Sequence, residues 1–282
     1  MNQVNRVRLA VPMFLAMMLL SGPAFAQMDF SGVWTPNGQQ DSASEPYVGN
    51  WFGIPMNKPA MQRASIWEAS IQTLPEWQCR PHSIAYITRG PSQLRITKDV
   101  DPVTRRVASY HIEWLRSVDN SIYLDGRPHP PEWAEHTWGG FSTAEWVGNV
   151  LKITTTHIKE DYYRRNGVPQ SDKATMTHYW IRRGDFLTWM TITYDPVYLT
   201  EPLVRSTEYR FTNNEVAPYP CTVVSEVDRP RGEVPSIMPG ENKMLTEFLN
   251  KGPLRLSEET VRGGAETMYP EFRTKIRVNP SN

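Results

Sequence analysis

Residues 175–194 read TMTHYWIRRGDFLTWMTITY, which places two strand-like runs, Thr175 to Arg182 and Phe186 to Tyr194, around the pair Gly184-Asp185. Both runs are rich in β-branched and aromatic residues, and the second alternates between a hydrophobic face and a face that carries threonines beside a tryptophan. A Gly-Asp pair between two such runs is typical of the tight turn of an antiparallel hairpin. We therefore predict a β-hairpin here and a mainly β fold.

The same strand character recurs through most of the chain. It is found at Gln93 to Lys98, Val107 to Trp114, Ser121 to Leu124, Ala144 to Val147, Val150 to Thr156, Val204 to Phe211 and Thr222 to Val227. The turn Gly148-Asn149 predicts a second hairpin. Helices are expected only from about Pro59 to Leu74 and near Glu241 to Asn250. We predict an antiparallel barrel with long decorated loops and a C-terminal tail that contains one short helix.

The N-terminal 26 residues have the layout of a cleaved secretory signal. Two arginines precede an apolar run from Leu9 to Leu20, and Ala24-Phe25-Ala26 follows it. We expect a mature chain that begins at Gln27 in the periplasm or outside the cell, with an uncleaved N-terminal anchor as the alternative. The apolar run is shorter than the ~20 residues of a membrane span, so no span is expected.

Composition and length limit the remaining possibilities. The formal net charge is +0, with 30 Lys and Arg against 30 Asp and Glu, so no long-range field attracts nucleic acid, and we exclude a nucleic-acid partner. The mature length suits one decorated barrel, which we place at residues 27–227. Beyond residue 228 the chain is richer in Pro, Gly and charge, and we expect residues 228–282 to be an extension packed on the barrel. The oligomeric state is not predicted.

The chain has two cysteines, Cys79 and Cys221. In an oxidising compartment they are expected to pair and to close a loop across most of the fold. Such a bridge stabilises a fold by about 4–5 kcal/mol in the chain-entropy model. Two free or intermolecularly paired thiols are the alternative.

Two loops between the predicted strands concentrate polar and aromatic side chains. Asp125-Gly126 turns the chain before three prolines that hold Arg127 and His129 with little freedom. The second loop follows His157, the last residue of a predicted strand, and carries the candidate site residues Asp161, Tyr162, Tyr163 and Arg164. Their types suit general acid-base chemistry beside a cation. The alternatives are a rigid loop capped by its histidine and a solvated charged loop.

The sequence lacks the residue spacings typical of metal sites, serine nucleophiles and nucleotide-binding loops. His111 and Glu113 share a strand face that His129, His136 and His157 could approach, but no His-x-His or HExxH motif is present and no metal site is expected. Ser142 is not flanked by glycines on both sides, which argues against a nucleophile elbow. No phosphate-binding loop or dinucleotide motif occurs, so no cofactor is expected.

Several longer stretches of the chain, taken together, resemble a known protein family. They are DFSGVW, Cys79-Arg80-Pro81, IYLDGRPHP, the segment from Trp138-Gly139 to Trp146, RRNGVPQSD, DPVYLTEP and GGAETMYPEF. Together they resemble a broad, largely uncharacterised family of exported bacterial proteins with lipocalin-like (calycin-like) β-barrels, over nearly all of the mature chain. The resemblance implies a secreted barrel with a loop-lined cavity and brings no known reaction. His82-Ser83-Ile84 departs from the usual Gly-x-Pro of that family.

Two functions are compatible with these residues. The first is binding of a small, mostly apolar or cyclic ligand, with Arg127, Trp138, Asp161, Tyr163 and Arg164 as the candidate ligand-binding residues. The second is a lyase, isomerase or hydrolase in which His129, His157 and Tyr162 move protons and an arginine stabilises the oxyanion. Because no catalytic spacing stands out, ligand binding is the main prediction. A structural or adaptor protein of the envelope is a third possibility.

Overall fold

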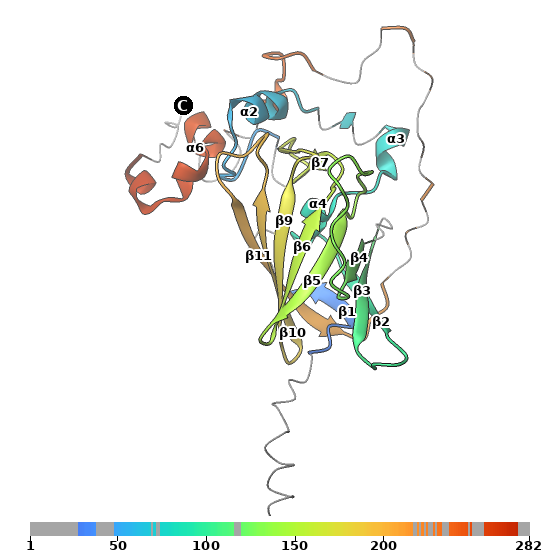
Figure 1. Cartoon of the computed structure of the whole chain (residues 1–282). Coiled ribbons are helices and arrows are strands. Elements are labelled where there is room, and N and C mark those ends of the chain that lie inside the picture. Colours follow the sequence, from blue (N-terminus) through green and yellow to red (C-terminus); the bar gives the residue numbers. More distant parts are fainter. Residues whose placement is uncertain are drawn as a thin grey trace, which may run out of the picture.

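The computed structural model describes residues 28–37, 48–68, 70–71, 74–115, 120–216, 219, 221–222, 224, 228, 230–232, 237–247, 249 and 257–275. Its centre is a closed barrel in the order β1-β11-β10-β9-β6-β5-β4-β3-β2, in which β1 pairs with both β2 and β11 (Figure 1). The strands are β1 (Gly32–Pro36), β2 (Leu94–Val100), β3 (Val107–Trp114), β4 (Asn120–Tyr123), β5 (Phe141–Val147), β6 (Val150–Thr156), β9 (Thr175–Arg183), β10 (Phe186–Tyr194) and β11 (Leu203–Thr212). The predicted lipocalin-like barrel is thus present as a fold. The expected signal at residues 1–26 lies outside the described residues.

Both predicted hairpins are confirmed. Val147 pairs with Val150, and Arg183 pairs with Phe186, so each turn consists of two residues. Gly148 and Gly184 have φ values of +61° and +59°, a conformation that tight hairpin turns require and that glycine adopts without strain.

One pair of neighbouring strands differs from the antiparallel prediction. β4 and β5 run parallel, with Ile122 opposite Ser142. The connection between them, residues 124–140, is long enough to return the chain to the starting end of the barrel, whereas a tight turn forces the antiparallel direction. This long connection contains the predicted Arg127–His129 loop.

The interior of the barrel is aromatic and partly polar. Trp34, Trp180 and Trp189 are among the largest fully buried side chains, and the Trp34 indole donates a hydrogen bond to the Phe30 carbonyl oxygen over 2.9 Å. On β10 the threonine face is the buried one: Thr191 is 2 % exposed. The predicted alternation of β10 is therefore present, and the face that points into the barrel carries threonine hydroxyls as well as Trp189.

A short helix closes one end of this interior. All four residues of α4 (Ile84–Ile87) are buried, and the next residue, Thr88, accepts a hydrogen bond through its carbonyl oxygen from Thr207 Oγ1 over 2.9 Å. Thr207 lies on the inner face of β11, so the turn after α4 reaches into the barrel (Figure 1). Arg89 follows with its guanidinium 4.3 Å from the centre of the Tyr86 ring.

The expected helix from Pro59 to Leu74 is shorter in the structure. α2 (Lys58–Ser65) begins where the Asn57 side chain accepts a hydrogen bond from the Ala60 N–H, with a proline in its first turn. A separate helix, α3 (Pro75–Gln78), follows and has its proline at the first position, where the missing N–H costs nothing. Among the described residues of this region, α2 and α3 are thus two separate helices.

Asn242 and Val261 of the C-terminal extension contact residues 51–67. Asn242 Nδ2 donates to the Trp67 carbonyl oxygen over 2.7 Å, and the Val261 carbonyl oxygen accepts from the Trp51 N–H over 3.0 Å. The elements here are α5 (Met244–Glu247), α6 (Glu258–Arg262) and the 3-10 helices η2 (Ala265–Met268) and η3 (Pro270–Lys275). They lie beside α2 at the end of the barrel that α3 also covers (Figure 1).

Two further predictions concern this last part of the chain. The helix expected near Glu241 to Asn250 is reduced to α5, and residues 222 and 224 of the strand expected at Thr222 to Val227 belong to no strand, while residues 223 and 225–227 lie outside the described residues. None of the described helices has the length and hydropathy to cross a bilayer.

Candidate functional site

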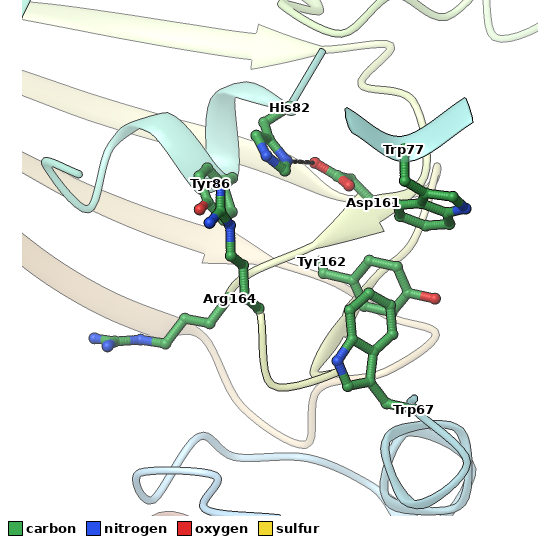
Figure 2. Close-up of a pocket in the computed structure, with 8 residues that line it drawn as sticks. Trp67, Trp77, His82, Tyr86, Asp161, Tyr162 and Arg164 are labelled. Carbon is green, nitrogen blue, oxygen red and sulfur yellow. Dashed lines mark ion pairs between the residues drawn. The ribbon is translucent and has the colours of Figure 1, made fainter. Parts of the chain in front are cut away.

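A pocket of about 80 Å³ lies at the end of the barrel covered by α2 and α3 (Figure 2). Two separate parts of the chain form it: the segment from Trp67 to Tyr86, which includes α3 and the start of α4, and the loop that follows β6. Its walls are Trp67, Trp77, His82, Tyr86, Asp161, Tyr162, Arg164 and Arg165. The pocket therefore has aromatic, acidic and basic sides.

A small two-stranded ribbon presents the residues of the second part. β7 (Asp161–Tyr162) pairs with β8 (Pro169–Gln170), and the Tyr163 N–H donates to the Val168 carbonyl oxygen over 2.9 Å. Gly167 in this turn has φ +86°, and a Cβ atom there would lie 2.3 Å from Trp67 Cβ. Because residue 167 is a glycine, the β7-β8 ribbon can lie close to Trp67, and Tyr162 of β7 contacts the Trp67 ring.

Three aromatic rings form one side of the pocket. The ring centres of Trp67 and Tyr162 are 4.3 Å apart, and Trp77 lies edge-on to Trp67 at 5.8 Å. Figure 2 shows the three rings gathered together: Trp77 comes from α3, Tyr162 from β7 and Trp67 from the chain just after α2. Such a group offers flat apolar surface and stays rigid because each ring packs on the next.

The opposite side carries a histidine paired with a buried carboxylate. His82 Nδ1 lies 3.6 Å from Asp161 Oδ2, and that oxygen also accepts a hydrogen bond from the Ser83 N–H over 2.7 Å. The Asp161 side chain is only 1 % exposed. The His82 ring is stacked on Tyr86, with centres 3.9 Å apart and planes 14° apart. The imidazole is therefore held in place by a ring and a carboxylate.

The electrostatic surroundings of Tyr162 are dominated by burial and by arginines. Burial raises the pKa of its phenol, while the nearby Arg63 and Arg80 guanidinium groups oppose that rise. Arg63 also forms an ion pair with Glu160, and Arg80 lies over the Trp77 ring at 4.3 Å. Tyr162 is thus a neutral hydrogen-bonding group at ordinary pH.

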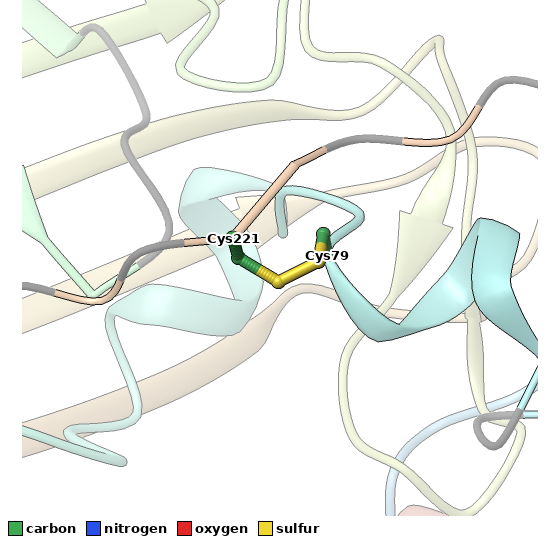
Figure 3. The surroundings of a disulfide bond; sticks show 2 residues. All are labelled: Cys79 and Cys221. Atoms are coloured by element: carbon green, nitrogen blue, oxygen red, sulfur yellow. A yellow bond between two sulfur atoms is a disulfide. The ribbon is translucent and has the colours of Figure 1, made fainter.

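The disulfide predicted between Cys79 and Cys221 is confirmed, with the Cα atoms 5.5 Å apart (Figure 3). Cys79 directly follows α3, so it is two residues from Trp77 and three from His82 in the sequence. The disulfide therefore ties the end of α3, beside Trp77, to residue 221.

Three of the predicted site residues, Asp161, Tyr162 and Arg164, line the pocket. Arg164 is 4 % exposed and lies 5.0 Å from the centre of the Phe52 ring, so its guanidinium points away from the three aromatic rings (Figure 2). Tyr163 does not line the pocket: it is 1 % exposed, and its hydroxyl donates to Asp195 Oδ2 over 3.4 Å.

His129 and His157 come together elsewhere, beside β5 and β6. Pro131 has only a carbonyl acceptor here, so His157 Nε2 donates to it over 3.0 Å and His157 Nδ1 accepts from the Thr156 hydroxyl over 2.7 Å. His129 Nδ1 then donates to Thr156 Oγ1, and its Nε2 accepts from the Thr143 hydroxyl, both over 2.8 Å. All four ring nitrogens are thus used within the protein, and neither histidine lines the pocket. Burial and the neighbouring His157 lower the pKa of His129.

The other two predicted ligand-binding residues also lie outside the pocket lining. Arg127 is exposed, pairs with Asp125 and covers the Tyr123 ring at 3.7 Å. Trp138 has Arg80 at 4.9 Å and Lys159 at 5.6 Å from its ring. Arg127 and Trp138 thus each make a cation–ring contact outside the pocket lining.

Sequence reasoning did not assign Trp67, Trp77, His82 and Tyr86 to the site. They lie on short helices and turns whose local pattern looks like ordinary core packing. Their one signal is the concentration of aromatic residues and a histidine between Trp67 and Tyr86, next to the cysteine at position 79. Among the described residues, no group of three or more His, Cys, Asp or Glu side chains is arranged to hold a metal ion.

Comparisons of the chain with protein-family models, curated proteins and solved structures find no match in any of the three. Membership of the lipocalin-like exported family therefore stays a prediction, alongside a barrel that the structure does contain. What the pocket binds has to be inferred from its own geometry.

Proposed function

We propose that this protein binds a small, mostly apolar, cyclic molecule in the pocket at the covered end of the barrel. The observation that carries the proposal is the grouping of Trp67, Trp77 and Tyr162 on one side of the pocket, with polar groups on the other. Binding sites for small molecules combine mainly aromatic walls with a few fixed polar groups that orient the ligand. His82 and Tyr162 serve as those groups.

We further infer that binding takes place in the periplasm or outside the cell. The signal-like sequence at residues 1–26 supports export, and the Cys79–Cys221 disulfide fits an oxidising compartment. The same bridge anchors the wall that carries Trp77, so the binding site is complete only where the disulfide persists.

A second candidate function is acid-base catalysis, which the pair His82 and Asp161 favours. A buried carboxylate near Nδ1 holds an imidazole in one orientation and raises its basicity, and Tyr162 supplies a proton donor in the same pocket. His82 then takes the role that the sequence suggested for His129 or His157. An isomerisation fits this set, because the proton that leaves one carbon returns to another and no co-reactant is required.

One experiment separates the two functions. The purified protein and its His82→Gln variant are incubated with a small-molecule extract of the source cells, and bound and free compounds are followed over time by mass spectrometry. A binding protein retains a compound and releases it unchanged, and the variant retains it with altered affinity. Conversion of that compound into an isomer by the wild type alone identifies catalysis. If neither retention nor conversion occurs, both functions are rejected.

A further inference from the structure

The charged groups around the pocket are not balanced. Two arginines, Arg164 and Arg165, line it beside one carboxylate, Asp161. Since the Arg164 guanidinium lies over the Phe52 ring, Arg165 is the arginine that remains for a ligand. The Asp161 carboxylate is buried and already accepts the Ser83 N–H at 2.7 Å while lying 3.6 Å from His82 Nδ1. It is therefore compensated within the protein and adds little negative potential to the pocket.

Arg165 differs from the other cations of this region. Arg63 has Glu160 as its partner, whereas Arg165 makes no ion pair within the part of the chain that the structure describes. Arg165 is half-buried, which lowers the dielectric constant around its charge and strengthens its attraction for an anion. A guanidinium in this position is a ready partner for a carboxylate, because its planar N–H groups match two carboxylate oxygens.

Two further arginines lie near the aromatic side of the pocket. Burial raises the pKa of the Tyr162 phenol, and the Arg63 and Arg80 guanidinium groups oppose that rise. Arg63 is already paired with Glu160, so Arg165 remains the cation available to a ligand.

We propose that the ligand is a small planar organic anion, an aromatic or cyclic carboxylate, whose ring lies against Trp67, Trp77 and Tyr162 and whose carboxylate pairs with Arg165. This inference rests on the proposed binding function and adds the chemical class of the ligand. The flat group and the charge belong to one molecule because the aromatic wall and the arginine line the same pocket.

The test uses benzoate and benzamide, which have nearly the same shape and differ in charge. Their affinities for the purified protein are measured by ligand-observed NMR at low and high salt. Benzoate is expected to bind about tenfold more tightly or better, the ratio that one charge-assisted hydrogen bond provides. Added salt is expected to weaken benzoate binding and to leave benzamide unchanged.

Arg165→Gln is the informative variant, and Arg183→Gln, an exposed arginine at the end of β9, is its matched control. Arg165→Gln should reduce the preference for benzoate to about one, while Arg183→Gln should keep it. If both probes bind equally and Trp77→Leu abolishes their binding, the ligand is not selected for its negative charge. That result rejects the anionic ligand class but supports the binding function. Binding of neither probe overturns this ligand class, while retention of a cellular compound decides the binding function separately.

Discussion

The Trp189 indole donates a hydrogen bond to His178 Nδ1 over 3.1 Å, inside the closed barrel. An indole N–H can only donate, so Nδ1 is the acceptor and the proton of the neutral ring is on Nε2. That nitrogen lies 3.0 Å from Thr155 Oγ1, whose hydroxyl in turn lies 2.8 Å from Ser142 Oγ. Four neighbouring strands, β10, β9, β6 and β5, are thus joined by one neutral chain of hydrogen bonds between inward-facing side chains.

This chain predicts how stability depends on pH. Burial lowers the pKa of His178 to about 3, below its ordinary value of 6.5. The unfolded chain therefore binds more protons between these values, and the contribution to the free energy of unfolding is present above about pH 6.5 and lost as the pH falls toward 3. At pH 5 the loss is expected to be about 2 kcal/mol. Urea unfolding at pH 7.5 and pH 5 measures it.

His178→Gln provides the control for that measurement, because glutamine keeps donors and acceptors but does not titrate. The difference in free energy of unfolding between wild type and variant should shrink as the pH is lowered. A constant difference across this range would contradict a neutral buried His178.

The close approach of Gly167 to Trp67 predicts a second effect. In Gly167→Ala the new methyl group meets Trp67, in addition to the strain of a positive φ, whereas Gly184→Ala introduces the strain alone, since nothing lies within 4 Å of its Cβ position. We expect Gly167→Ala to lower the free energy of unfolding by about 1–3 kcal/mol more than Gly184→Ala. It should also weaken ligand binding, because Trp67 moves. Equal losses of stability in the two variants would show that the contact is unimportant.

Reduction of the disulfide should affect both stability and the pocket. Cys221 is exposed, so a thiol reductant can reach the bridge. The free energy of unfolding is expected to fall by about 4–5 kcal/mol in the chain-entropy model, and ligand affinity should fall with it, because α3 and Trp77 lose their anchor. Denaturant unfolding with and without reductant measures the first effect, and the double variant Cys79→Ser, Cys221→Ser should reproduce it. A reduced protein with unchanged stability and affinity would contradict this role.

The histidine network beside β5 and β6 should be structural. His129→Gln is expected to cost about 1–2 kcal/mol of stability, since its two threonine partners lose well-aligned hydrogen bonds. Ligand affinity should remain unchanged, in contrast to His82→Gln. Thermal unfolding and binding measurements on both variants compare them, and a selective loss of binding in His129→Gln would return that residue to the site.

The barrel could be predicted because its signals are local. Alternation and β-branched residues identify a strand from its own sequence, and a glycine turn such as Gly148-Asn149 identifies its hairpin partner. The parallel pair β4 and β5 could not be predicted, since the Asp125-Gly126 turn lies in a connection that is too long to fix the direction of the next strand. The length of α2 was overestimated because the apolar spacing of the sequence continues after Ser65, where α2 ends.

The pocket was predictable only in part. Asp161, Tyr162 and Arg164 stand out in sequence as a polar and aromatic loop. Trp67 and Trp77 are far from these residues in the sequence. The path of α2 and α3 over the barrel, together with the disulfide, places them in the same pocket. No local pattern encodes such a meeting. His129 in the Pro-rich loop and His157 at the strand end form hydrogen bonds with Thr156 of the barrel wall and do not reach the pocket.

The most direct test of the binding function compares three proteins with one small-molecule extract. Wild type, Trp77→Leu and Trp133→Leu are each incubated with it, and the retained compounds are measured by native mass spectrometry. Trp133 is 87 % exposed and outside the pocket lining, so its variant controls for the loss of a tryptophan. The expected result is one compound retained equally by wild type and Trp133→Leu and about tenfold less by Trp77→Leu. Equal retention by all three, or no retention by the wild type, would contradict a ligand site in this pocket.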